Sequence, residues 1–336
     1  MFGKLMNNFY YGKSGKADYT PDDLPKNRWE LFWEMLRVRF SGLVRLNMMY
    51  MIVWLPAMLV LLFSLTSVIQ TINYTNDELA GQTVQVEQSD GSTVDVTYIS
   101  STDSSNYTYS TIFYMFLLLI PCIAITGPFT AGACYVTRNW ARDEHAFIWS
   151  DFKDAIKANW KQGLVVSVIT GLIPFVVFVA WRFYSQMAAQ SSVFYVIPQV
   201  LIVAIGLLWC LSVTYMYPLL ITYQLKMVDV FRNAILLAIA RLPMSVGIRI
   251  LHCLPIVLFV VLTELFGNLA FLILGPLAWY VVVGFGLSRF VTASYTNGVF
   301  DKYINSKIEG VQVNRGLAND DDDDDDEDNS SEQPEA

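Results

Sequence analysis

Charged residues are scarce in this chain. Asp, Glu, Lys and Arg make up 15% of its 336 residues and hydrophobic residues make up 54%, whereas about a quarter of the residues of a soluble domain are usually charged. The formal net charge of −8 comes mainly from one acidic run, Asp320 to Asp328, so the rest of the chain is close to neutral. This composition predicts an integral membrane protein.

Cysteine is also scarce, and its spacing argues against disulfides and metal sites. The four cysteines, Cys122, Cys134, Cys210 and Cys253, lie in apolar stretches without CxxC spacing. Such cysteines are usually reduced thiols that pack as small apolar side chains. We therefore expect four buried, reduced thiols.

Neither of the two histidines has a sequence partner that would make a catalytic or metal site. His145 lies in the sequence RDEH and His252 begins an apolar stretch, and neither has HExxH or HxH spacing. Asp143, Glu144 and His145 are consecutive, so they cannot all face one ion from a regular helix. We expect no catalytic residue, no metal ion and no enzymatic activity.

Motifs for nucleotides and nucleic acids are missing as well. The chain has no Walker A sequence, no Rossmann glycine pattern after a strand, and no basic patch interleaved with aromatic residues. The N-terminus has no short apolar core followed by a small-residue cleavage site, so we expect no removable signal peptide. The sequence predicts no cofactor and no nucleic-acid partner.

Long apolar runs are what the sequence has in abundance. Each is near or above the roughly 18 to 20 residues that cross about 30 Å of hydrocarbon as a helix, and helices satisfy their backbone hydrogen bonds internally. The sequence thus predicts an all-α, polytopic membrane protein with six transmembrane helices. The runs are roughly Leu46–Thr71, Thr111–Tyr135, Leu164–Trp181, Val193–Tyr223, Val246–Leu265 and Leu269–Phe290.

The distribution of Lys and Arg predicts the orientation of these spans. Of the 22 basic residues, eight precede the first run, five lie between the second and third, four lie from Lys226 to Arg249, and four lie from Arg289 onward. Only Arg182 is left for the opposite side. By the positive-inside rule, we expect both termini in the cytoplasm.

Polar segments outside the runs divide the chain further. We expect a cytoplasmic polar N-terminus at 1–28, a six-span membrane domain at 29–309 with an outside loop at 72–110, and a disordered acidic tail at 310–336. Within the outside loop, alternating residues around Asp90-Gly91 predict a small β-hairpin near Thr83–Tyr98. We interpret the hairpin as an insertion and the tail as solvated, although each could bind a partner.

Amphipathic segments precede three of the spans and suggest a threefold repeat. The first begins at Trp29 and could lie flat on the membrane surface or simply extend the first span into the cytoplasm. Internal repeats are common in transporter folds, but they also occur in proteins that transport nothing. The repeat rests on three phenylalanines, each 22 to 24 residues before a proline: Phe32, Phe152 and Phe231 before Pro56, Pro174 and Pro255.

The most distinctive stretch runs from Gly127 to Gly163. Its second half predicts an amphipathic docking helix that suits an anionic membrane surface or an acidic partner. The apolar side of this helix has Phe152, Ile156 and Trp160, and the other side has Lys153, Lys157 and Lys161. We also expect helix breaks at glycines and prolines in the returning spans, namely Gly127, Pro128, Pro218, Gly275 and Pro276.

Charges within the spans bear on transport. Arg45, Arg182, Arg249, Glu264 and Arg289 all lie near predicted span ends, where their side chains can reach the interface. The lack of a carboxylate at mid-membrane depth argues against proton-coupled transport. Uncharged polar residues either line a path for a neutral solute or hydrogen-bond between helices, and we favour the second role: Asn47, Thr126, Thr170, Gln199, Thr214, Tyr215 and Asn268.

Several stretches resemble the YesL-like family of bacterial multi-span membrane proteins, a domain of unknown function. They are MFGK at the N-terminus, RLNMMYMIVWLP at Arg45–Pro56, TGPFTAGACYVTRNWARDE at Thr126–Glu144, FKDAIKANWKQ at Phe152–Gln162 and FRNAILLAIARLP at Phe231–Pro243. In the family, the first of the longer stretches leads almost directly to the second, whereas here about 70 residues intervene. The resemblance implies location in the bacterial cytoplasmic membrane, with genes that often neighbour those for carbohydrate uptake.

These observations lead to one functional hypothesis and one alternative. The hypothesis is a non-enzymatic accessory or partner-binding component associated with carbohydrate uptake, in contact with the lipid bilayer and with carbohydrate transport components. The alternative is a transporter or channel for a small neutral solute such as a sugar. It requires a polar-lined cavity through the spans.

Overall fold

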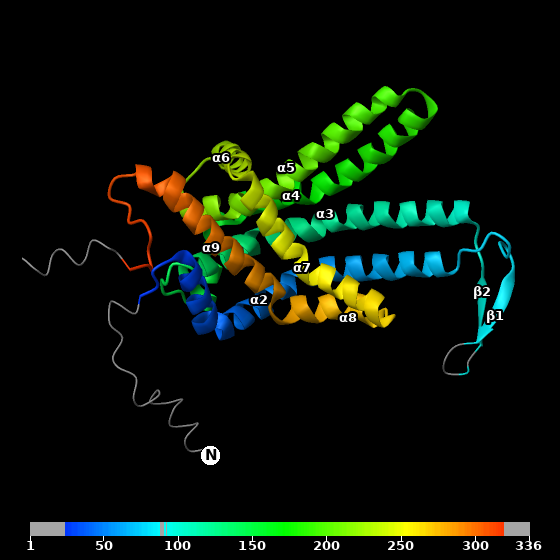
Figure 1. Ribbon diagram of the computed structural model, residues 1–336, viewed down its shortest axis with the longest axis horizontal. Coiled ribbons are helices and arrows are strands. Elements are labelled where there is room, and N and C mark those ends of the chain that lie inside the picture. The colour runs from blue at the N-terminus through cyan, green and yellow to red at the C-terminus, as the bar shows by residue number, and fades with distance from the viewer. Residues whose placement is uncertain (1–23, 88–90, 92, 319–336) are drawn as a thin grey trace, which may run out of the picture.

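The computed structural model describes residues 24–87, 91 and 93–318, most of which are helical. The helices form an elongated bundle with a two-stranded sheet at one end (Figure 1). The elements are, in chain order, α2 (Arg28–Asn73), β1 (Thr83–Glu87), β2 (Thr93–Thr97), α3 (Ser101–Trp140), α4 (Ile148–Gln190), the 3₁₀ turn η2 (Val193–Tyr195), α5 (Val196–Thr222), α6 (Met227–Ala240), α7 (Leu242–Phe266), α8 (Ala270–Trp279), the π-helical turn η3 (Tyr280–Gly284), α9 (Phe285–Tyr303) and η4 (Asn305–Lys307).

Six helical segments are long and apolar enough to cross a membrane, which confirms the predicted fold class. They are α2, α3, α4, the continuous pair η2–α5, α7, and the segment that joins α8, η3 and α9. At most 22% of the residues in their most apolar stretches are buried inside the bundle. Most of this apolar surface therefore faces outward, where lipid rather than water is the favourable solvent.

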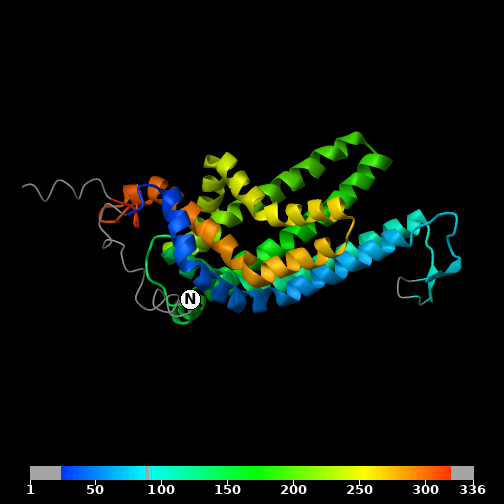
Figure 2. The same ribbon diagram turned by 60° about the horizontal axis from the view of Figure 1, so that its bottom comes forward.

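The bundle has two unlike ends, which Figures 1 and 2 both show. At one of them, which we call the basic end, the starts of α2, α4 and α6 meet the ends of α3, α5 and α9. At the other, which we call the hairpin end, β1 and β2 connect α2 to α3. In Figure 1 the α4–α5 hairpin inclines away from α2 and α3 toward this end, so the helices are most tightly gathered at the basic end.

The buried core lies toward the basic end and consists of two apolar clusters. One includes Tyr215 of α5 and Phe300 of α9, together with residues of α3, α4 and α6. The other joins α2, α3 and α9 through Leu46, Trp140 and Phe290. Because both clusters contain residues from α9, the last span is packed against both halves of the bundle.

The contact between α3 and α4 depends on glycine and on one serine. A Cβ atom on Gly127 would collide with the backbone of Gly163 and with the hydroxyl of Ser167. One residue later, Pro128 has no N–H, so the carbonyl of Ala124 loses its usual helical partner. The Ser167 hydroxyl of α4 donates to that carbonyl at 2.7 Å, which satisfies the freed group from a neighbouring helix.

The prediction that Gly127, Pro128, Pro218, Gly275 and Pro276 break helices is wrong. Helix α3 runs without interruption through the first two, α5 continues past Pro218, and α8 contains the last two. Proline is tolerated inside spans because neighbouring helices and side chains satisfy the backbone groups that it frees. These positions therefore allow close packing or slight bending, but they do not end helices.

The irregular part of the last span is the π-helical turn η3, which is supported by Asn47 of α2. A π-turn disturbs the regular helical hydrogen bonds. The buried amide of Asn47 donates to the carbonyls of Tyr280 and Val281 at 3.1 and 2.7 Å. Its oxygen accepts from the Gly286 N–H at 2.8 Å. One side chain thus provides three hydrogen bonds that tie the first span to the last.

The three amphipathic segments do not share one helix geometry. Helices α2 and α4 each continue unbroken from the amphipathic segment into the apolar span, so the first and second segments are extensions of spans and not separate surface helices. The third forms its own helix, α6, which ends before Arg241. Pro243 lies in the first turn of α7, where no backbone N–H donor is needed.

The structure confirms the predicted β-hairpin. Strands β1 and β2 pair antiparallel, with Thr83 opposite Thr97 and Val86 opposite Val94. Gly91 has φ of 80°, a backbone conformation that glycine adopts readily. Asp90 lies outside the described residues.

The segment between α2 and α3 is shorter than the outside loop predicted at 72–110, because α3 begins at Ser101. The Ser100 hydroxyl oxygen accepts from the Asp103 N–H at 3.1 Å and starts the helix in polar sequence. An apolar run shows only which part of a helix suits the membrane core. The Ser100 cap lets α3 begin ten residues before its apolar run, in polar sequence.

Ordered packing also extends beyond residue 309, where the acidic tail was predicted to begin. Arg315 forms an ion pair with Glu144 at 2.5 Å, and the Ala318 N–H donates to the Pro25 carbonyl at 3.0 Å. Residues 310–318 therefore lie against the basic end. The aspartate run belongs to 319–336, which, like 1–23, lies outside the described residues.

Candidate functional site

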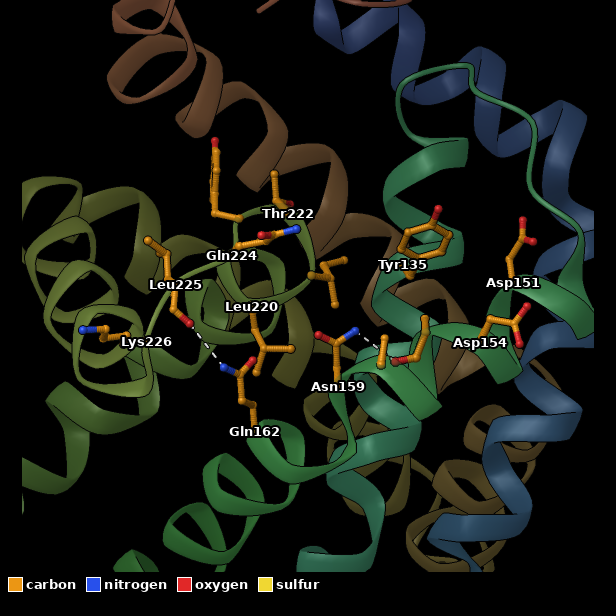
Figure 3. A pocket seen from close by; sticks show the side chains of 14 residues that line it. Tyr135, Asp151, Asp154, Asn159, Gln162, Leu220, Thr222, Gln224, Leu225 and Lys226 are labelled. Carbon is orange, nitrogen blue, oxygen red and sulfur yellow. Dashed lines mark hydrogen bonds between the residues drawn. The ribbon is translucent and has the colours of Figure 1, made fainter.

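A groove of about 880 Å³ opens at the basic end between α4 and α5 (Figure 3). One wall is formed by the first four turns of α4, and the other by the end of α5 and the turn that leads to α6. Tyr135 of α3 also lines it. Because these elements meet at the two apolar clusters, the walls of the groove are held by the core of the bundle.

The start of α4 presents three faces with different chemistry. Phe152 is buried against α3, where its ring and carbonyl lie next to Gly132. A second face carries exposed lysines, which are Lys153, Lys157 and Lys161. The third face lines the groove with Asp151, Asp154, Ala155, Ala158, Asn159 and Gln162.

Opposite charges lie at the two ends of the groove. Figure 3 shows Asp151 and Asp154 on one side and Lys226 on the other. Asp151 accepts a hydrogen bond from the Phe147 N–H at 2.9 Å, a favourable place for a carboxylate at a helix N-terminus. Asp154 lies 3.8 Å from Lys157 in an exposed pair, and such pairs contribute little to stability. Both carboxylates remain at the groove surface.

The opposite wall offers backbone carbonyls and neutral polar side chains. The last carbonyls of a helix have no partner within it, and here they belong to the end of α5. The Gln162 amide of α4 donates to one carbonyl of the following turn, that of Leu225, at 3.2 Å. The Tyr223 hydroxyl donates to Asn305 at 2.7 Å, and burial raises the pKa of Tyr223 to about 12. Tyr223 is therefore a neutral hydrogen-bonding group at physiological pH.

The groove can bind a polar ligand through many directed contacts. Its walls supply carboxylates, amides, hydroxyls, backbone carbonyls and one ammonium group. Its volume lies within the range of about 300–1,000 Å³ that is usual for binding pockets. The separation of charges along it suits an extended segment with a cation at one end better than a compact neutral solute.

The predicted docking helix is only partly presented to solvent. Phe152 serves the core, with 5% of its surface exposed, whereas Trp160 is 49% exposed. The Lys161 ammonium lies 5.6 Å from the centre of the Trp160 ring, within cation–π range. The available docking surface is therefore the three lysines with Trp160, beside the groove; Ile156 packs with Phe152 on the inner side.

The charged sequence after α3 forms a turn held by ion pairs. Asp143 has φ of 54°, which directs the chain from α3 toward α4. It lies 3.9 Å from Arg39, while Glu144 pairs with both Arg142 and Arg315. These contacts give the turn a structural role at the edge of the basic end.

The histidines and cysteines do not gather into a site. His145 packs its ring against that of Phe147, with centroids 4.5 Å apart. In the part of the chain that the structure describes, no three His, Cys, Asp or Glu residues are placed to hold a metal ion. All four cysteines are free thiols, but only Cys134 is buried, and Cys210 and Cys253 are exposed on helices that suit lipid contact. The prediction of four buried thiols is therefore confirmed for Cys134 alone, since Cys122 is half-buried.

Several polar groups of the spans hydrogen-bond between helices. The Trp209 indole donates to Thr170 at 3.2 Å. The Tyr215 hydroxyl lies 2.7 Å from that of Ser245 and 2.8 Å from that of Tyr295. Together with Asn47, these contacts favour the structural alternative for the uncharged polar residues over a path for solute.

None of the six residues predicted for the docking helix lines the groove. The turn after α5 was not identified either, although its polar residues Gln224 and Lys226 come directly after the apolar run that ends at Tyr223. That signal places polar groups at a span end. It does not show that the end of α5 lies opposite the start of α4, because this depends on how the helices pack.

Comparison with known proteins gives one match. The family described as "Protein of unknown function, DUF624" matches residues 107–181, which include most of α3, the charged turn and most of α4. No curated protein and no solved structure matches the chain. The chain is therefore similar to DUF624 over the helix pair that forms one wall of the groove.

Proposed function

We propose that this chain is a non-enzymatic accessory protein of a carbohydrate-uptake system in the bacterial cytoplasmic membrane. It binds a protein partner at the basic end, which faces the cytoplasm together with both chain termini. The observation that carries the proposal is the charged groove between α4 and α5, beside an exposed row of lysines on α4.

The family match supports the membrane context of this proposal. The YesL family is part of DUF624, and the stretches Thr126–Glu144 and Phe152–Gln162 that resemble it lie within residues 107–181. Genes of that family often neighbour carbohydrate-uptake genes, which is the source of the proposed partner class. The resemblance and the groove meet at the same segment, the start of α4.

Charge and shape support a polypeptide partner. The carboxylates Asp151 and Asp154 and the carbonyls at the end of α5 favour a cationic side chain of the partner. The lysines outside the groove favour acidic residues next to it and increase the rate of encounter by electrostatic steering. A partner segment with neighbouring basic and acidic residues satisfies both surfaces.

Affinity capture of the full chain in mild detergent tests the proposal. We expect carbohydrate transport components to co-purify. Replacement of Lys153, Lys157 and Lys161 by alanine should lower their recovery about tenfold, the effect of losing about 1.4 kcal/mol of binding free energy. The double variant Lys302→Ala and Lys307→Ala is a matched control, because it removes exposed lysines from the same end but from α9 and η4.

The groove needs a variant of its own. Asp154→Lys reverses one charge without removing the Asp151 cap, and we expect it to lower recovery while the protein remains monodisperse. The proposal is contradicted if no transport component is recovered from the parent under conditions that preserve a known membrane complex. Unchanged capture by both the lysine and the Asp154 variants would show that the partner binds elsewhere.

A further inference from the structure

Two arginines of different spans lie beside a contact between α7 and α9. Arg249 of α7 and Arg289 of α9 are close enough to repel each other electrostatically. His252 lies one helical turn after Arg249, on the same side of α7. Its Nε2 lies 3.1 Å from the carbonyl of Ser288, the residue before Arg289. The α7 and α9 sides of this cluster therefore face each other.

The two positive charges have no carboxylate partner among the residues that the structure describes. None of the ion pairs there includes Arg249 or Arg289. The groups that surround Arg289 are Cys134, Tyr50 and Tyr217, thiol and phenol groups that carry no charge at neutral pH. These neighbours place the start of the Arg289 side chain within the bundle, and its reach to the membrane interface stays a prediction.

The neighbours of Arg249 do not neutralise it either. They are Cys210 of α5 and Cys253 of α7. Glu264 is on the same helix but fifteen residues away, which is about 22 Å along a helix. The cluster therefore holds two uncompensated positive charges.

Two buried polar atoms of the cluster also have no partner within the described part of the chain. They are Nε of Arg249 and Nδ1 of His252. Because Nε2 of His252 faces a carbonyl, which can only accept, Nε2 carries the hydrogen and Nδ1 is an acceptor. A buried guanidinium nitrogen without an acceptor is costly. The cluster thus offers donors for an anion and one acceptor for a hydroxyl.

The depth and surroundings of the cluster fit a lipid headgroup. Arg249 is seven residues after Leu242, the first residue of α7, which is about 10 Å along the helix axis. Long side chains can reach lipid headgroups from such a depth. Apolar residues flank Arg249 on the outer surface of α7, where Ile250 is 63% exposed and Leu254 is 54% exposed. Acyl chains can therefore lie beside the site. Basic pockets between spans are known binding places for anionic headgroups.

We propose that Arg249, Arg289 and His252 bind the phosphodiester of an anionic phospholipid from the leaflet at the basic end. The guanidinium groups donate to the phosphate oxygens. Nδ1 of His252 accepts from a headgroup hydroxyl, which favours phosphatidylglycerol. The bound lipid neutralises the two arginines and fills the contact between α7 and α9.

Native mass spectrometry of the delipidated full chain in neutral detergent tests this site. We expect phosphatidylglycerol to bind about tenfold more tightly than phosphatidylcholine, and Arg249→Gln and Arg289→Gln each to remove this preference. Arg249→Lys should retain part of it. Arg182→Gln is the matched control, because Arg182 lies toward the hairpin end, 5.1 Å from the Tyr109 ring. It should leave lipid binding unchanged.

The role of His252 has a separate test. Phosphatidylmethanol has the same phosphodiester charge as phosphatidylglycerol but no headgroup hydroxyl. We expect the parent to prefer phosphatidylglycerol, and His252→Phe to bind the two lipids equally. A parent without this preference would overturn the hydroxyl contact.

Protein stability provides a control for folding. Without lipid, Arg249→Gln removes charge repulsion, so its melting temperature should be equal to or above that of the parent. With phosphatidylglycerol, only the parent should gain stability. Three results would each overturn the proposal. They are equal binding of phosphatidylglycerol and phosphatidylcholine, unchanged binding by Arg249→Gln, and displacement of the lipid by millimolar inorganic phosphate. The last result would identify a site for free anions.

Discussion

Gly127 allows α3 and α4 to approach closely, and its replacement should be costly. In Gly127→Ala, the new Cβ has no space against Gly163 and Ser167, and such overpacking costs about 1–3 kcal/mol. Thermal unfolding in detergent should show the loss. Gly247→Ala is the control, because no atom lies within 4 Å of its added Cβ. A helix favours alanine over glycine by up to about 1 kcal/mol, so the control should not lose stability. Equal losses in both variants would contradict this account.

Ser167 and Pro128 should be energetically coupled. Ser167→Ala removes the donor to the Ala124 carbonyl and should cost about 1–2 kcal/mol of unfolding free energy. In a Pro128→Ala background, the restored N–H of residue 128 can bond the same carbonyl, so the loss of Ser167 should cost less. A double-mutant cycle measured by unfolding gives this difference. The same cost in both backgrounds would show that Ser167 does not compensate for the proline.

At the scale of elements, Asn47 is expected to be the side chain on which the π-helical turn η3 depends. Asn47→Leu leaves buried carbonyls and one N–H without a partner, at about 1–3 kcal/mol for each unsatisfied group. We expect a large fall in stability. Asn268→Leu is the matched control, because Asn268 provides a single exposed hydrogen bond at the start of α8. Its loss should cost about 1 kcal/mol. Similar losses in the two variants would contradict a special role for Asn47.

The same elements show what sequence patterns could predict. Apolar runs predicted six spans because a bilayer requires long apolar helices, and Asp90-Gly91 predicted the hairpin because glycine suits its turn. The continuity of α3 through Pro128 was not predictable from α3 alone, since it is supported by Ser167 of another helix. The groove itself was not predicted, because its walls come from segments that are distant in sequence.

At the scale of the whole molecule, the basic end combines the buried core, most of the charged side chains and the groove. The hairpin end has the two-stranded sheet and helices whose apolar surfaces face outward. By the positive-inside rule, this asymmetry of charge predicts that the basic end faces the cytoplasm. The proposed partner and lipid sites both require the basic end to face the cytoplasm.

Cysteine labelling can determine this orientation directly. After replacement of the four native cysteines, Asp95→Cys places one thiol on the exposed strand β2, and Lys157→Cys places one at the basic end. In intact cells, a membrane-impermeant maleimide should label the first variant and not the second, because the positive-inside rule predicts that only the hairpin end is outside. After permeabilisation, both should react, which controls for accessibility. Labelling of Lys157→Cys in intact cells would reverse the topology, and it would contradict a cytoplasmic partner at the groove even if the helix packing described above is right.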